Sequence, residues 1–214
     1  YKEIQGFPIQ NLSSDPVPYA QELADNPYQG VWSSGGALNQ AKTQIAGFGT
    51  QTAGLAAGGN VPPETANVEL YDGSSWTETT NLNTAKRLGV GIGTVQTAGL
   101  VAGGYAPGGY LTTNESWDGS SWTELADLNT AKGAGGGAGT QTAGLAFAGA
   151  PGTPQATCES WNGTAWTEVG ALDLGRRNLG SAGTTNTAAL AFGGDNPFTA
   201  NTEEWNGSAW TEVA

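Results

Sequence analysis

Short apolar segments separated by glycine-rich turns run through most of the chain. Residues 97–102 (TAGLVA) are apolar and end at a Gly-Gly pair, whereas residues 121–125 (SWTEL) alternate between polar and apolar side chains. Alternation with a period of two indicates a β-strand that is buried on one side. Glycine suits the turns between such strands because it adopts positive φ without steric cost. The pattern therefore predicts an all-β protein.

The same succession of segments occurs four times, about 45 residues apart. The segments QTAGL, QTAGL, QTAGL and NTAAL begin at residues 51, 96, 141 and 186. Each is followed by a pair of small residues: Gly58-Gly59, Gly103-Gly104, Ala148-Gly149 and Gly193-Gly194. Each repeat then has an aromatic residue, an Asp-Gly or Asn-Gly turn and a tryptophan: Trp76, Trp122, Trp166 and Trp210. We expect these glycines and tryptophans to have structural roles.

Each repeat contains four strand-like segments, which in the second repeat are residues 88–94, 97–102, 114–117 and 121–125. The last two flank Asp118-Gly119, a pair that favours a type I′ hairpin turn. Four antiparallel strands per repeat match one blade of a β-propeller, and no repeat shows the apolar spacing of an amphipathic helix. The sequence thus predicts four four-stranded blades, made of residues 42–79, 86–125, 132–169 and 176–213.

A Gly-Gly pair after a hydrophobic strand, followed by an aromatic residue with Asp and then by Trp, resembles the kelch repeat. The resemblance extends from Val31 to about Val213 and implies a kelch-like β-propeller. The wording of the repeats (LNTAK, GTQTAGLAFAG, YDGSSWTE) and the leader PIQNLSSDP are also similar to kelch-like proteins of marine tailed bacteriophages. Those proteins are regarded as virion appendages, so this second resemblance implies a location on a virion surface.

The number of blades and the start of the chain raise separate questions. The first strand of each repeat is rich in Gly and Ala, which permits the close packing that a narrow four-blade axis needs. The segment around Trp32 copies a fourth strand, although the last repeat already has its own at Trp210. This surplus copy leaves open a partial fifth blade, an edge strand or a strand that completes a neighbouring subunit. We assign this segment to the propeller domain, residues 31–214, in which it precedes the four repeats.

Residues 1–30 contain four prolines, which fix φ and lack a backbone donor. We expect this stretch to be an extended N-terminal arm that binds other virion proteins. A leader without an anchoring role is the alternative.

Composition excludes several classes of function. The net charge of −12 disfavours binding to nucleic acid, because phosphates are also negative, and to anionic membranes. No apolar run approaches the roughly 20 residues of a membrane-spanning helix. Histidine is absent, so no Ser-His-Asp or Cys-His site is possible. The glutamates recur with the repeat, which indicates architecture rather than one active centre. We therefore expect no enzyme activity, no cofactor and no metal.

The basic residues share one repeat position. Six of the seven lie in the loops that lead into the blades: Lys42, Lys86, Arg87, Lys132, Arg176 and Arg177. Two interpretations stay open, a ring that binds anions or glycans and a set of salt bridges between blades to the recurrent glutamates. The loops between the second and third strands vary most, and variable loops on a rigid scaffold often carry binding. We therefore expect them to share a binding face with the basic residues, through Tyr105, Tyr110 and Phe198.

The resulting hypothesis is a non-enzymatic structural or binding propeller on a phage virion, such as a capsid decoration, a tail fibre or another appendage. The main alternative is a host-attachment module that binds surface glycan. Either protein can also form a homo-oligomer. An intracellular kelch adaptor and a glycan-cleaving enzyme are weaker alternatives, the adaptor because no accessory domain is evident in the sequence.

Overall fold

The computed structural model describes residues 34–153 and 155–213. Within these residues the named secondary-structure elements are all β-strands. The described residues contain no helix long and apolar enough to cross a membrane. Sixteen strands form four antiparallel four-stranded sheets, each corresponding to one sequence repeat. The prediction of four four-stranded blades in a propeller arrangement is confirmed. Trp32 and residues 1–30, with the surplus strand and the arm, lie outside the described residues.

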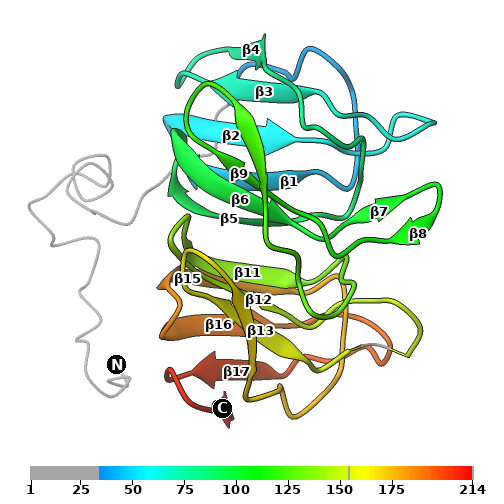
Figure 1. Cartoon of the computed structure of the whole chain (residues 1–214), viewed down its shortest axis with the longest axis vertical. Coiled ribbons are helices and arrows are strands. Elements are labelled where there is room, and N and C mark those ends of the chain that lie inside the picture. Colours follow the sequence, from blue (N-terminus) through cyan, green and yellow to red (C-terminus); the bar gives the residue numbers. More distant parts are fainter. Residues whose placement is uncertain (1–33, 154, 214) are drawn as a thin grey trace, which may run out of the picture. The chain divides into compact units, whose positions relative to one another are not determined.

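The strands of each blade follow one another along the chain (Figure 1). Blade 1 contains β1 (Ala46–Thr50), β2 (Ala53–Ala57), β3 (Val68–Tyr71) and β4 (Trp76–Thr79). Blade 2 contains β5 (Val90–Val95), β6 (Ala98–Ala102), β9 (Asn114–Trp117) and β10 (Trp122–Leu125). Blade 3 contains β11 (Gly136–Thr140), β12 (Ala143–Phe147), β13 (Cys158–Trp161) and β14 (Trp166–Val169). Blade 4 contains β15 (Gly180–Thr185), β16 (Ala188–Phe192), β17 (Thr202–Trp205) and β18 (Trp210–Val213).

The first strand of blade 2 starts at Val90, two residues later than the sequence pattern predicts. The reason is Leu88, which has a φ of 58°, and Gln44, Ala134 and Asn178 have positive φ at the equivalent position of the other blades. This left-handed conformation interrupts an extended strand. One further difference follows directly from the sequence, since blades 2 and 4 carry an extra residue before the first turn. It produces a register shift between β5 and β6, and another between β15 and β16.

The turn between the third and fourth strands differs from the predicted type I′ turn. In blade 1, Tyr71 pairs with Trp76, so four residues connect the strands and only Gly73 has positive φ. The Asp72 Oδ1 atom accepts hydrogen bonds from the backbone N–H groups of Ser74 and Ser75, both at 2.8 Å. Asp118, Asn162 and Asn206 accept the equivalent bonds in the other blades. A short polar side chain that caps its own turn thus explains the recurrence of Asp and Asn.

The hydrophobic core lies between adjacent blades rather than inside any one of them. Three clusters of buried side chains join blade 1 to blade 2, blade 2 to blade 3 and blade 3 to blade 4. The innermost strands approach closely, because a Cβ on Gly91 would overlap the backbone of Gly47 and a Cβ on Gly137 that of Gly91. Among the described residues, β1 and β15 do not pack in this way, so blades 1 and 4 each leave one face uncovered.

Two ends of the strands carry different connections. The variable loops of residues 60–66, 105–113, 150–157 and 195–200 follow the second strands, and we call the end that carries them the loop face. A two-stranded hairpin that the sequence analysis did not predict, β7 (Tyr105–Ala106) and β8 (Gly109–Tyr110), projects from it on the right of Figure 1. Isolated bridges join these loops to the basic loops, as between Arg87 and Tyr105. The opposite end, with the short turns, is the turn face.

Candidate functional site

Four of the six basic residues in the interblade loops are buried. Lys42, Lys86 and Arg176 form ion pairs with Glu69, Glu115 and Glu203 at N–O distances of 3.1, 2.9 and 2.9 Å. All six side chains are at most 1% exposed. In each pair the cation comes from the loop that enters the blade, and the glutamate lies on the third strand of that blade. The pairs therefore attach each loop to the blade that follows it.

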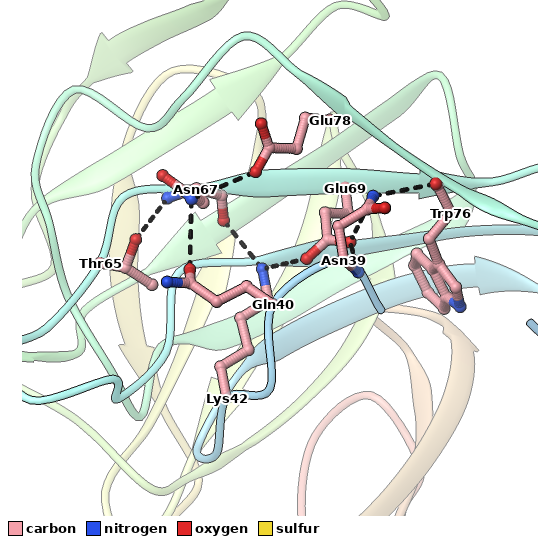
Figure 2. A network of polar contacts seen from close by, with 8 residues as sticks. All are labelled: Asn39, Gln40, Lys42, Thr65, Asn67, Glu69, Trp76 and Glu78. Carbon is pink, nitrogen blue, oxygen red and sulfur yellow. Dashed lines mark hydrogen bonds and ion pairs between the residues drawn. The ribbon is translucent and has the colours of Figure 1, made fainter. Parts of the chain in front are cut away.

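Figure 2 shows this arrangement in blade 1. The Glu69 carboxylate accepts hydrogen bonds from the backbone N–H of Asn39 at 2.7 Å and from its side-chain amide at 3.0 Å. Lys42 also donates to the carbonyl oxygen of Asn67, and Asn39 donates to that of Trp76. Burial alone would raise the pKa of Glu69, but the hydrogen bonds from Asn39 and the charge of Lys42 hold it below its ordinary value. The carboxylate is thus ionised and is held within the fold by Asn39 and Lys42.

In blade 3 the equivalent residues, Lys132 and Glu159, form a different set of hydrogen bonds. The Lys132 ammonium donates to the carbonyl oxygens of Ala148 and Thr157, to the Thr157 hydroxyl and to the Gln155 side chain. Glu159 instead accepts from the backbone N–H groups of Asn129 and Thr130. Burial lowers the pKa of Lys132, and the charge of Glu159 opposes this shift.

The structure therefore corrects the expectation of a ring of six exposed cations. Lys42, Lys86, Lys132 and Arg176 cannot contact a ligand at the surface, because their charged groups are enclosed by the fold. The interpretation as salt bridges is correct for Lys42, Lys86 and Arg176, but each glutamate lies in the blade that the loop enters, so these ion pairs do not join neighbouring blades as predicted. Arg87 and Arg177, one residue further along the chain, remain accessible.

Arg87 belongs to a polar and aromatic cluster on the loop face of blade 2. Its guanidinium group lies over the Tyr105 ring, 4.7 Å from the ring centroid, and pairs with Glu64 at 3.1 Å. Tyr105 meets Tyr110 edge to face at a centroid distance of 5.2 Å. The structure thus brings together three of the predicted binding residues, each of them partly exposed. Planar rings beside hydrogen-bonding groups suit the stacking of a sugar or of another ring.

Blade 4 carries a second, simpler arrangement on the same face. Arg177 pairs with Asp195 at 3.0 Å, and Asn178 donates to the other oxygen of that carboxylate at 3.0 Å. The bond from Asn178, together with Arg177, holds the pKa of Asp195 below its usual value. Phe198, in the same loop, is 92% exposed. No aromatic contact joins Phe198 to the two tyrosines among the described residues.

The predicted structural residues have the expected environments with one exception. Trp122, Trp166 and Trp210 are buried, but Trp76 is only half-buried. The Gly-Gly pairs have positive φ throughout, and a Cβ on Gly103 would overlap the carbonyl oxygen of Lys132. Ala148 adopts the same conformation with φ 60°, at a cost of about 1 kcal/mol relative to glycine.

The aromatic residue that ends the third strand has a structural role that the repeat pattern did not predict. Trp117, Trp161 and Trp205 are at most 3% exposed and each donates its ring N–H to a backbone carbonyl in the first turn of the same blade. Their recurrence before each turn was the available signal. Cys158 is also fully buried, and burial raises the pKa of its thiol to about 12. The described residues contain no group of three Cys, Asp or Glu side chains placed to hold a metal ion.

No family model matches the chain, and no curated protein matches it.

Proposed function

We propose that this chain is a non-enzymatic binding propeller of the kelch type, exposed on a phage virion as a capsid decoration, a tail fibre or another appendage. The observation that carries the proposal is the division between a repeated scaffold and a variable face. The scaffold uses the glutamates of its third strands and four of its cations internally. The loop face differs from blade to blade and presents Arg87, Tyr105, Tyr110, Arg177 and Phe198.

The kelch and virion parts of the proposal are supported by the sequence pattern. The order of strand, Gly-Gly pair, aromatic turn and Trp is that of kelch repeats, and the wording of the repeats is similar to that of phage appendage proteins. An arm of residues 1–30 that holds the propeller on the particle belongs to the same proposal.

Particle composition tests the location. We expect mass spectrometry of purified virions to detect the chain, and labelling with an antibody against the propeller to mark the particle surface. Deletion of residues 1–30 should leave the propeller folded and remove it from particles. Virions that lack the chain, or that incorporate the truncated chain normally, would contradict the location or the anchor respectively.

The second candidate is attachment to a host-surface glycan, favoured by the Arg87–Tyr105–Tyr110 cluster. A glycan array probed with the wild-type chain tests it, together with the Tyr105→Ala and Phe198→Ala variants. We expect a signal that falls at least tenfold in one of them, whereas Val95→Ala, an exposed position on the turn face, retains it. No signal on any glycan, or equal signals from all variants, would contradict attachment.

A further inference from the structure

The three contacts between neighbouring blades follow one scheme. We call the side of a blade that meets the preceding blade its front face, and the side that meets the following blade its back face. On the back face of blade 1, Phe48 lies against Gly93 and Gly99 of blade 2. Ile92 of blade 2 lies against Gly137 and Gly144 of blade 3 in the same way. A side chain on each back face thus fills the space above small residues on the next front face.

Polar contacts repeat across the same three interfaces. The Gln96 amide donates to the carbonyl oxygens of Gly54 and Tyr71 in the preceding blade. Gln141 donates to Ser116 and Trp117, and Asn186 donates to Ser160. An amide in the first turn of blades 2, 3 and 4 therefore binds the third strand of the blade before it.

The back face of blade 4 has all these features, but no blade follows it among the residues that the structure describes. Phe147 of blade 3 is fully buried, 4.7 Å from the ring of Trp210 in blade 4. Phe192 is its counterpart in blade 4 and is 43% exposed. Beside it a hollow of about 350 Å³ is lined by residues that include Ala182, Leu190 and Glu204. The counterparts of Leu190, which are Leu55, Leu100 and Leu145, are buried.

The front face of blade 1 is left open in a complementary way. Trp76 is half-buried, whereas its counterparts Trp122, Trp166 and Trp210 pack against the preceding blade. Leu38 is half-buried, whereas the corresponding Leu82, Leu128 and Leu172 are buried. Gln51 is exposed, and a Cβ on Gly47 would meet only the neighbouring strand of its own blade. Blade 1 therefore lacks only a preceding back face.

We propose that a second copy of this chain supplies both missing contacts. The back face of blade 4 packs against the front face of blade 1 of the second copy, and the reverse contact closes the ring. Phe192 then meets Trp76 as Phe147 meets Trp210, and the Gln51 amide donates to the Glu204 carboxylate. Glu204 occupies the position of Ser116 and Ser160, the acceptors of the equivalent bonds.

The number of copies follows from the number of blades. Closed propellers typically have four to eight blades, so a ring made of whole copies contains four or eight. Among the described residues β1 and β15 do not pack together, which leaves eight blades from two copies. A contact between two different faces closes into a ring when the rotation that relates one copy to the next returns to the first copy after a whole number of copies.

Sedimentation equilibrium of the full chain is the first test. We expect a mass twice that of one chain for the wild type and of one chain for Leu190→Glu and Phe192→Glu, with unchanged far-UV circular dichroism. Phe198→Glu places the same charge on an exposed aromatic of the loop face and should stay dimeric. A wild-type monomer, or dimers of both back-face variants, would overturn the proposal.

Cysteine cross-linking tests the geometry independently of folding. Neither Gln51→Cys alone nor Glu204→Cys alone should give a disulfide-linked dimer. The proposed contact brings residue 51 of one copy to residue 204 of the other, so two identical cysteines do not meet. Mixing the two variants under mild oxidation should give one. Cys158 is buried and does not compete. A linked dimer from either variant alone would indicate contact between like faces. A chain that carries both cysteines provides a further control. A disulfide within that chain would indicate that one copy closes the ring of blades by itself. Either result overturns the proposal.

Discussion

The faces buried between blades and the two faces left at the ends of the array carry the same repeat but have different environments. Trp122 and Trp76 follow equivalent turns, yet Trp122 packs into the core between blades 1 and 2 and Trp76 is half-buried. The ion pairs that the entering loops form do not show this difference between blades. Lys42 is as deeply buried against Glu69 as Lys86 is against Glu115. Burial of the tryptophan therefore depends on a neighbouring blade, whereas burial of the ion pair depends only on the loop.

The largest expected effect comes from the ion pairs and tests the second half of this comparison. Glu115→Ala leaves a buried ammonium group without its carboxylate, which typically costs about 3–5 kcal/mol. We expect Glu69→Ala to cost as much, although blade 1 lacks a preceding blade. Urea denaturation of both variants measures this. Glu64→Ala, which removes the partly exposed partner of Arg87, should cost less than about 1 kcal/mol. A mild effect of Glu69→Ala alone would show that the pair needs the neighbouring blade.

The tryptophans test the first half. Trp122→Ala should destabilise the chain by roughly 3–5 kcal/mol, because it empties a packed interface. Trp76→Ala should cost less than this, because Trp76 is only partly buried and packs against no preceding blade among the described residues. Thermal and urea unfolding in the Leu190→Glu background keeps the chain monomeric for this measurement. Equal costs for the two substitutions would mean that the front face of blade 1 is as well packed as an internal one.

A smaller effect is expected from the turn amides. Gln141→Ala removes two hydrogen bonds to blade 2 and should cost about 1 kcal/mol. In the same monomeric background Gln51→Ala should leave the urea midpoint unchanged, because that side chain is exposed. A loss of stability at Gln51 would place an acceptor near it within the same chain.

The smallest effect at neutral pH concerns the turns that all blades share. The hydrogen bonds from the Ser75 and Ser121 backbones hold the pKa values of Asp72 and Asp118 well below the usual range. The folded state therefore binds fewer protons than the unfolded state as the pH falls through about 4, and stability is lost there. Asp72→Asn with Asp118→Asn should fold normally, as Asn162 and Asn206 do in blades 3 and 4. The drop in urea midpoint between pH 6 and pH 3 should be smaller in this double variant than in the wild type.

Much of the fold was predictable because it is local and repeated. The turns at Asp72 and Asn162 and the Gly-Gly pairs depend on side chains and φ values within a few residues. The start of each first strand was less predictable, since Leu88 and Ala134 adopt positive φ although neither residue type favours it. The hairpin of β7 and β8 occurs in one repeat only and so had no periodic signal.

The candidate site was predictable in position but only partly in composition. The bridge between Arg87 and Tyr105 places the variable loops beside the basic loops, as expected. The sequence did not distinguish Lys86 from Arg87, which are adjacent but point into the blade and toward the loop face respectively. Periodicity identifies equivalent positions, and the direction of a side chain in an irregular loop depends on the partners that the fold brings to it.

The sequence by itself determined the sixteen strands of the blades, their order and the positions of the turns between them, because these depend on alternation, glycine and local capping. The tertiary structure alone decided which copies of a repeated residue are buried. Leu145 and Leu190, or Phe147 and Phe192, are equivalent in sequence, and only the first of each pair has a following blade to cover it. Burial is a property of what lies opposite a side chain, and a repeat sequence does not say where the series of blades is interrupted.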